Sequence, residues 1–214
     1  MIKDRQNRYV ITITGASGSI YAERLIRFLL EAKKQVICLI SSTGLKVVKE
    51  ELNWDIDNRD AKDVGQRLRD IFFTNRDKLQ YEDKQLIYYD NRDLLADIAS
   101  GSNSIAAMIV IPCSMGTLAR IAQGISSNLI ERTADVCLKE KRPLIIVPRE
   151  CPFNEIHIQN MLTLSRVGAS IIPAMPAFYY HPKNIDELVG YVVGKVLSGL
   201  GIYHNLYEKW GEGE

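Results

Sequence analysis

The chain has 214 residues, of which 46% are hydrophobic and 25% charged, and its formal net charge at pH 7 is +1. This length and balance fit one globular domain, and the near-zero charge gives no indication of a nucleic-acid or membrane partner. The polar start MIKDRQNR has no apolar core after it, and no apolar run approaches the roughly 20 residues that span a bilayer. We therefore expect a cytoplasmic protein without a signal peptide, consisting of a single domain over residues 1–214.

The expected elements of the first half are, in chain order, a strand over 9–14 (YVITIT), a helix after GASGS that reaches Leu29, a strand over 36–40 (VICLI), a helix over 43–52, a polar stretch over 53–85 with helical periodicity around 64–72, and a short strand over 86–89.

The second half continues in the same way, with a strand over 106–111 (AAMIVI), a helix from CSMGT to Gly124, a helix over 129–141, a strand over 144–147, a helix over 154–167, a strand start over 170–172 and a last helix over 186–200. Strands that are continuous apolar runs and alternate with helices indicate a parallel sheet that is covered on both faces. The predicted fold class is therefore α/β, a doubly wound Rossmann-like or flavodoxin-like sheet. Such folds bind their ligands at the carboxyl ends of the strands.

Four cysteines, Cys38, Cys113, Cys137 and Cys151, form no CxxC pair and no Cys/His pattern with zinc spacing. Cys38 and Cys137 lie in apolar periodic segments, and Cys113 and Cys151 lie at strand ends, where packing is favoured over a functional role. We predict reduced thiols and no metal site.

Small hydroxyl residues and glycines follow several of the predicted strands. TGASGS follows the first strand, SST the second, and CSMGT the strand over 106–111. Backbone N–H groups and hydroxyls at helix N-termini are the usual ligands of a phosphate. The turns also fit plain helix capping, which is compatible with ligand binding. Two such turns on one sheet edge favour a ligand that carries a phosphate and more, such as a mononucleotide.

The first turn does not fit the common nucleotide motifs. Ile20 stands where G-x-G-x-x-G requires its third glycine, and the Gly-Lys-Ser/Thr of a Walker A loop is missing. Tyr179 and Lys183 have the Tyr-x-x-x-Lys spacing of short-chain dehydrogenases, but Pro182 prevents a regular helix there, so we reject that reading.

Arg149 and Glu150 directly follow the strand over 144–147. At a strand end that faces a phosphate, arginine offers a planar fork of donors, and Glu150 can orient it or move a proton. The alternative is a surface ion pair, which contributes little to stability.

The segment IPCSMGTLARIAQGISSNLIERTADVCLKEKRPLIIVPRECPFNEIHIQNMLTLSRVGASIIPAMPAFYYHP, together with TGASGSIYAERL, resembles the flavin prenyltransferase family (UbiX-like), formerly labelled aromatic acid decarboxylases. The resemblance implies transfer of a dimethylallyl group from dimethylallyl phosphate to N5 and C6 of reduced FMN. The product, prenylated FMN, would serve a UbiD-like decarboxylase. The family also implies a homododecamer with flavin sites at subunit contacts, and it requires no metal.

The resemblance assigns roles to individual residues. Ser17, Glu51 and Glu150 are the implied catalytic residues, and the adjacent Glu50 remains an alternative to Glu51. The implied FMN contacts are Gly15, Ala16, Ser17, Ser41, Ser114, Met115, Gly116, Thr117 and Arg149, and the implied contacts of the prenyl phosphate are Lys139, Arg149, Glu150, Tyr179, Lys195 and Trp210. The tail over about 202–214, which contains Trp210, is expected to pack over the site or on a neighbouring subunit.

This chain departs from the family at Lys195, where arginine is common. A lysine still neutralises phosphate, but as a point charge without a bidentate fork. The choice between dimethylallyl phosphate and pyrophosphate therefore stays open. Alternative functions are an FMN-binding subunit of a hydroxyarylic acid decarboxylase, a passive flavin carrier, and a relative of the FMN-dependent cysteine decarboxylases. The last requires a histidine in the first half of the chain, whereas the first histidine here is His157.

Overall fold

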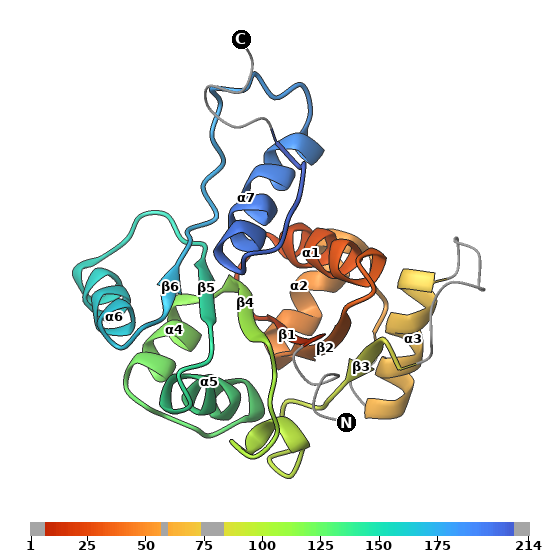
Figure 1. Cartoon of the computed structure of the whole chain (residues 1–214), viewed down its shortest axis with the longest axis vertical. Coiled ribbons are helices and arrows are strands. Elements are labelled where there is room, and N and C mark those ends of the chain that lie inside the picture. The colour runs from red at the N-terminus through yellow and green to blue at the C-terminus, as the bar shows by residue number, and fades with distance from the viewer. Residues whose placement is uncertain (1–6, 57–59, 74–83, 208–214) are drawn as a thin grey trace.

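The computed structural model describes residues 7–56, 60–73 and 84–207. Its centre is a six-stranded sheet in the order β3-β2-β1-β4-β5-β6, and all neighbouring strands pair in parallel (Figure 1). The strands are β1 Arg8–Ile13, β2 Gln35–Ile40, β3 Leu86–Tyr88, β4 Ala107–Cys113, β5 Leu144–Pro148 and β6 Ser170–Ile171. This order confirms the predicted doubly wound α/β fold.

Seven α-helices and one short 3-10 helix are present in the described ranges. They are α1 Ser19–Glu31, α2 Ser42–Leu52, α3 Ala61–Phe73, α4 Met115–Ala122, α5 Leu129–Lys139, α6 Glu155–Arg166, α7 Ile185–Gly199 and the 3-10 helix η2 Asp97–Ala99. The expected helices agree with these to within one or two residues at their ends, the usual uncertainty of helix boundaries. The weak periodicity around 64–72 corresponds to α3, whereas η2 was not predicted.

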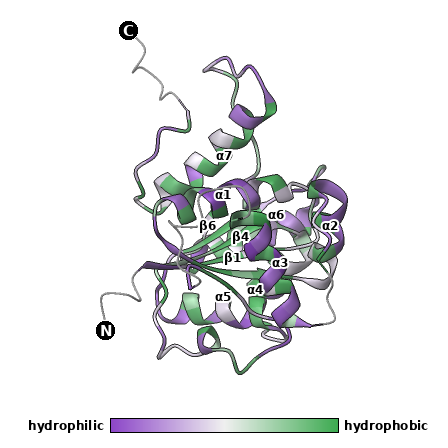
Figure 2. Cartoon of the chain, turned by 90° about the vertical axis from the view of Figure 1, so that its right-hand side faces the viewer, coloured by the Kyte–Doolittle hydropathy of each residue, from purple (hydrophilic) through white to green (hydrophobic). Residues whose placement is uncertain are grey.

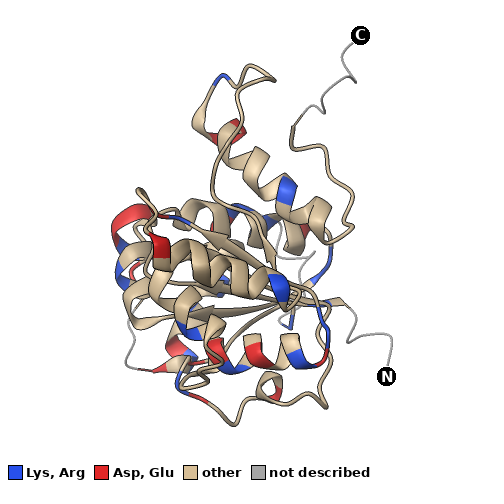
Figure 3. Cartoon of the chain, turned by 90° about the vertical axis from the view of Figure 1, so that its left-hand side faces the viewer, with Lys and Arg blue, Asp and Glu red and all other residues tan. Residues whose placement is uncertain are grey.

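Two apolar cores cover the two faces of the sheet, because side chains alternate between the faces of each strand. Ile11 of β1 and Ile109 of β4 pack on the side of α1, α2, α3 and α7, whereas Val10 and Met108 pack on the side of α4, α5 and α6. Hydrophobic strands therefore lie between two helical layers (Figure 2). Charged residues are concentrated on the helices and loops around the sheet (Figure 3).

The strand order reverses between β1 and β4, which places the topological switch point beside the turns that follow these strands. Helix α7 packs against α1, and the loop before α7 projects beyond the sheet and the other helices (Figure 1). In the parts of the chain that the structure describes, no helix has the length and apolarity that crossing a bilayer requires. Cys38, Cys113 and Cys137 are buried free thiols, and Cys151 is an exposed free thiol.

Candidate active site at the carboxyl edge of the sheet

The turns after β1 and β4 are tied together by Thr14. Its hydroxyl donates to the carbonyl of Pro112 at 2.8 Å and accepts from the backbone N–H of Ser114 at 2.7 Å. Both bonds are formed around a fully buried side chain. The two hydroxyl-rich turns predicted from the sequence therefore lie side by side at the switch point.

Gly15 brings the first turn against the N-terminus of α2. A Cβ added at Gly15 would lie 2.7 Å from Cγ2 and 2.9 Å from Cβ of Thr43, closer than such atoms approach in real proteins. Only glycine permits this contact. Ser41 caps α2 by accepting from the N–H of Gly44 at 3.0 Å. The first N–H groups of α2, those of Ser42 and Thr43, have no partner within the helix and adjoin the Gly15 turn.

Helix α1 is capped by a distant carboxylate instead of its own N-cap side chain. Gly18 occupies the N-cap position with φ 113, in the left-handed region that favours glycine. Glu51 of α2 accepts from the N–H of Gly18 at 3.0 Å and from that of Ser19 at 2.8 Å, both through Oε2. The N-terminus of α1 is thus already occupied by an anion.

Glu51 is held in its ionised form. Burial raises its pKa, but hydrogen bonds from the Ser17 side chain and from the backbone of Ser19 and Gly18 outweigh burial and lower the pKa below its ordinary value. Glu50 and Glu51 are both exposed residues of the same helix, but among the described residues only the Glu51 carboxylate of this pair accepts hydrogen bonds. The contacts therefore favour Glu51 over Glu50.

The second turn opens α4. Ser114 is the N-cap residue, its hydroxyl accepts from the N–H of Thr117 at 3.4 Å, and the two hydroxyl oxygens lie 3.1 Å apart. Met115 is buried in the core, so only its backbone remains for a ligand, while Gly116 is exposed. A Cβ at Gly116 would come within 3.4 Å of Arg120 Nη1.

Arg149 connects the turn after β5 to the turn after β1. Its N–H continues the sheet ladder to the carbonyl of Cys113 at 3.3 Å, and its Nε donates to the carbonyl of Ser17 at 3.1 Å. The Glu150 carboxylate accepts from the N–H of Cys151 at 3.0 Å. Among the ion pairs of the described ranges there is none between Arg149 and Glu150.

Tyr179 and Lys195 belong to an aromatic cluster around α7. The centroid of the Tyr179 ring lies 6.1 Å from that of Tyr191, and Lys195 Nζ lies 5.4 Å from the ring centroids of both Tyr191 and Tyr207. Burial lowers the pKa of Lys195, but Tyr207 and Tyr191 outweigh burial and raise it. Lys195 is therefore a cation at neutral pH.

Lys139 lies apart from the other candidates. It ends α5, whose C-terminus adjoins the loop before β4 and therefore the opposite edge of the sheet from Ser17 and Ser114. Its Nζ lies 3.5 Å from a carboxylate oxygen of Glu140. Trp210 falls outside the described residues. The described part of the tail, up to Tyr207, packs along α7, where Leu206 approaches Gly190 and Tyr207 approaches Gly194.

Sequence reasoning missed several residues that support the site. Arg120 donates from Nη2 to the hydroxyl of Thr117 at 3.2 Å and pairs with the buried Glu131. Tyr191 and Tyr207 flank Lys195. The helical spacing of Arg120 from Thr117 offered a signal for the first contact, whereas the tyrosine contacts depend on how the tail packs, which the sequence does not reveal.

The arrangement suits a phosphorylated, planar ligand. One edge of the sheet combines hydroxyl groups from Ser17, Ser41 and Ser114, unpaired N–H groups at helix starts, and the guanidinium of Arg149. Gly15 and Gly116 leave the backbone accessible because they carry no side chain. Among the described residues, no group of three or more His, Cys, Asp or Glu side chains is arranged to hold a metal ion.

Comparisons with known proteins agree with this chemistry. The model of the Flavoprotein family matches residues 2–197. A curated protein of Halalkalibacterium halodurans named flavin prenyltransferase UbiX is 47% identical over 204 residues, which are 95% of this chain and 93% of that protein. The solved structure of AnUbiX (PadA1) in complex with FMN and dimethylallyl pyrophosphate has a TM-score of 0.80 and 33% identity, and the match covers 97% of this chain and 98% of that one.

A third relative bears on assembly. The structure of a dodecameric FMN-dependent UbiX-like decarboxylase from Escherichia coli O157:H7 has a TM-score of 0.78 and 36% identity, and the match covers 95% of this chain and 98% of that chain. These similarities extend over nearly the whole chain, and they include the turns after β1 and β4 that form the candidate site. The chain therefore belongs to the Flavoprotein family and, within it, to the UbiX-type flavin prenyltransferases.

Proposed function

We propose that this chain transfers a dimethylallyl group from dimethylallyl phosphate to reduced FMN and releases prenylated FMN. The observation that carries the proposal is the joining of three strand-end turns, by Thr14 between β1 and β4 and by Arg149 between β5 and β1, in a chain of this family. The remaining steps assign parts of the reaction to individual residues.

The FMN phosphate binds at the N-terminus of α2 rather than at that of α1. The N–H groups of Gly18 and Ser19 already bond to the Glu51 carboxylate, which would repel a second anion. Ser42 and Thr43 offer N–H groups and hydroxyls next to Gly15, whose missing side chain allows the first turn to pack this closely against the N-terminus of α2. The flavin ring then extends toward the Ser114–Thr117 turn, where hydroxyl groups can bond its polar edge.

Arg149, Tyr179 and Lys195 bind the prenyl phosphate. As the allylic C–O bond breaks, negative charge increases on the phosphate, and cations already in position stabilise that charge. Lys195 is a cation whose pKa its tyrosine neighbours raise further, and Arg149 is anchored through Nε, which leaves its terminal nitrogens for a ligand. Glu150 is the next residue after Arg149. It orients the same phosphate indirectly, by helping to fix the turn that carries Arg149.

The reduced flavin supplies the electron-rich ring that accepts the prenyl group. Glu51 stays ionised beside the first turn, and its carboxylate favours the developing cation of the prenyl group. Its lowered pKa makes it a weak base. The departing inorganic phosphate is a stronger base than a carboxylate with a lowered pKa, so it is the better acceptor for the proton lost from C6. Ser17 donates to Glu51 and so fixes the carboxylate toward the turn.

A neighbouring copy of the chain supplies Lys139. Within one chain this residue lies at the opposite sheet edge from Ser17 and Ser114. A dodecameric relative of 36% identity supports a closed homo-oligomer for this chain. The exposed apolar residues Met175 and Phe178 before α7 are suited to such a contact. Trp210 and the rest of the tail complete the site or the contact between copies.

The product serves a UbiD-like decarboxylase in the cytoplasm. The alternatives account for fewer of the observations: a passive flavin carrier has no use for the cation at Lys195, and a cysteine decarboxylase has no histidine available before His157. A decarboxylase subunit would release carbon dioxide from a hydroxyarylic acid, which the proposed enzyme does not do alone.

The test is an anaerobic reaction of the purified chain with reduced FMN and dimethylallyl phosphate. Mass spectrometry should find a flavin heavier by one C5H8 unit. Parallel reactions with dimethylallyl pyrophosphate identify the donor form, and a reaction with a hydroxyarylic acid tests for carbon dioxide. Unchanged FMN with both donors would refute the proposal.

A further inference from the structure

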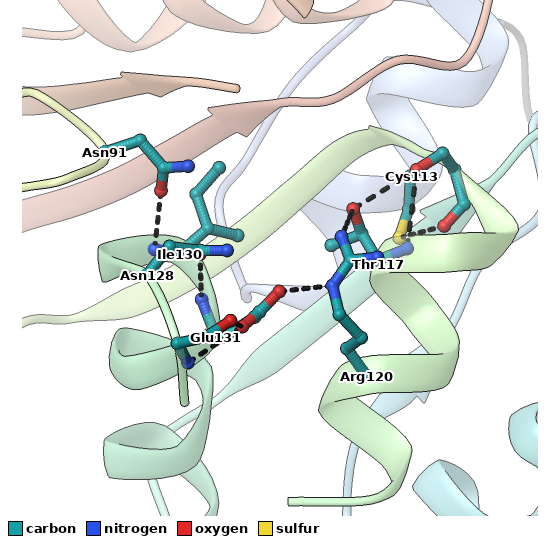
Figure 4. Close-up of polar contacts among 9 residues, drawn as sticks. Asn91, Cys113, Thr117, Arg120, Asn128, Ile130 and Glu131 are labelled. Atoms are coloured by element: carbon teal, nitrogen blue, oxygen red, sulfur yellow. Dashed lines mark hydrogen bonds and ion pairs between the residues drawn. The ribbon is translucent and has the colours of Figure 1, made fainter. Parts of the chain in front are cut away.

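The Ser114–Thr117 turn is supported from behind by a relay of side chains that reaches into α5 (Figure 4). The relay consists of Thr117, Arg120, Glu131 and Ser127. We propose that Arg120, fixed by Glu131, is a positioning residue that orients the hydroxyls of Thr117 and Ser114 for the flavin. The inference rests on the proposed function, because it takes FMN as the ligand of this turn.

Glu131 is the fixed end of the relay. Its side chain is 0% exposed, and its Oε2 accepts from the N–H of Ser127 at 2.9 Å and from the hydroxyl of Ser127 at 2.6 Å. Its other oxygen pairs with Nε of Arg120. A buried carboxylate is stable only when its oxygens are paired in this way. Glu131 is therefore an immobile partner and not a solvated helix charge.

The first turn of α5 holds Glu131 in place. The side chain of Asn128 caps the helix by accepting from the N–H of Glu131 at 3.0 Å. Asn91, which follows β3, accepts from the N–H of Ile130 at 3.0 Å (Figure 4). Asn128 and Asn91, which belong to two separate segments, thus fix the start of α5 and with it the position of the Glu131 carboxylate relative to the sheet.

Arg120 transmits this position to Thr117. The guanidinium is planar, so pairing of Nε with Glu131 also fixes the direction of Nη2. Nη2 donates to Thr117 Oγ1 at 3.2 Å. The Arg120 side chain is 44% exposed, and an exposed arginine with one partner would sample many rotamers. Two partners at fixed points restrict it to one.

The hydroxyl protons of Ser114 and Thr117 can be counted to find how many are left for a ligand. Arginine can only donate, so Thr117 Oγ1 must accept from Arg120. Ser114 and Thr117, whose oxygens lie 3.1 Å apart, share one of their two protons. The second proton is left for a ligand. Thr117 is buried and Ser114 is half-buried. Arg120 holds the two hydroxyls from the buried side, so one hydroxyl proton can point toward the ligand.

The experiment measures the dissociation constants of FMN and of dimethylallyl phosphate for the full-length chain. The variants are Arg120→Met, Thr117→Val, Thr117→Ser and the double variant Arg120→Met/Thr117→Val, with Arg67→Met as the matched control, because Arg67 forms an ion pair with Asp63 on α3. Circular dichroism and thermal melts without ligand establish that each variant is folded at the assay temperature.

We expect Arg120→Met to weaken FMN binding about tenfold, comparable to one hydrogen bond, and to leave the affinity for dimethylallyl phosphate unchanged. Thr117→Val should weaken FMN binding similarly, and Thr117→Ser should preserve it. Because Arg120 acts through the Thr117 hydroxyl, the double variant should bind no more weakly than Thr117→Val alone. A merely structural role would give additive losses or affect both ligands.

Arg120→Met leaves the buried Glu131 without its cation and could fail to fold. In that case Arg120→Lys is used, because lysine keeps a cation beside Glu131 but cannot also bond Thr117 as the planar guanidinium does. The same loss of FMN affinity is expected. FMN affinity that Arg120 substitutions do not change, or additive losses in the double variant, would overturn the positioning role. That outcome is distinct from failure of the proposed function, in which the wild-type chain forms no prenylated FMN.

Discussion

The carboxylate of Glu51 lies 2.8 Å from the backbone nitrogen of Ser19, so a side chain of α2 caps the N-terminus of α1. Glu51 and Glu50 are adjacent in sequence, yet within the described part of the chain only the Glu51 carboxylate of the two forms this contact. Both residues are exposed, so the pair offers a direct comparison of a hydrogen-bonded carboxylate and one without that contact on the same helix.

Replacing Glu51 with glutamine should slow prenyl transfer by about 100-fold or more, the range for loss of a charged group that acts at the reacting centre. An amide keeps the shape but loses the negative charge and one acceptor. The measurement is the single-turnover rate of prenylated FMN formation under anaerobic conditions. Glu50→Gln is the matched control and should remain within twofold of the wild type. A larger effect at Glu50 would transfer the catalytic role to that residue.

Acid should remove the stabilising contribution of Glu51. Hydrogen bonds hold its folded-state pKa below the ordinary value of 4.5, so its contribution is fully present above that value and is lost as the pH falls through the lowered pKa. The difference in thermal stability between wild type and Glu51→Gln should therefore be constant near pH 7 and shrink below pH 4.5. Melting curves over this range provide the check, and a difference that grows on acidification would contradict it.

Gly15→Ala should damage both stability and FMN binding. The new methyl group would lie 2.7 Å from Cγ2 of Thr43, and overpacking of this kind costs about 1–3 kcal/mol. Urea unfolding and FMN titration measure the two effects. Thr43→Ser removes Cγ2, so the double variant Gly15→Ala/Thr43→Ser should recover part of the lost stability. No recovery would mean that the strain arises elsewhere.

Removing the cation of α7 should affect the prenyl donor and not the flavin. Lys195→Ala is expected to raise KM for dimethylallyl phosphate about tenfold, because a charged hydrogen bond to phosphate is lost. Tyr207→Phe keeps the ring but removes the hydroxyl that bonds Lys195, so a smaller rise is expected. Lys62→Ala, an exposed lysine on α3, is the control. Equal losses of FMN affinity in Lys195→Ala would contradict this assignment.

Mixing two inactive variants tests whether Lys139 acts across a subunit contact. Lys139→Ala and Glu51→Gln are expected to be inactive separately, while co-expressed chains should form some sites that take both native residues from different copies. Random mixing predicts about a quarter of wild-type activity. Activity no higher than that of the separate variants would place Lys139 in the same copy as Glu51 or outside the reaction.

The fold and the position of the strand-end turns followed from local sequence patterns. Continuous apolar strands such as 107–111 predict a parallel sheet, and that alone brings the turns at Gly15 and Ser114 to one edge. Contacts between elements were beyond such reasoning. The capping of α1 by Glu51 and the pairing of Arg120 with Glu131 depend on how helices pack. The separation of Lys139 from Ser17 follows from the direction of α5, which the resemblance did not convey.

The contact between Arg149 and Ser17 joins residues that are 132 positions apart in the chain. A chain in which β5 is not yet in place cannot form it, so this part of the candidate site exists only in the complete fold. Bound FMN would then act on the folding equilibrium as a whole, stabilising the complete chain by about 2.7 kcal/mol at a hundredfold excess over Kd. The same stabilisation would lower the fraction of unfolded chain that is open to proteolysis, independently of catalytic turnover.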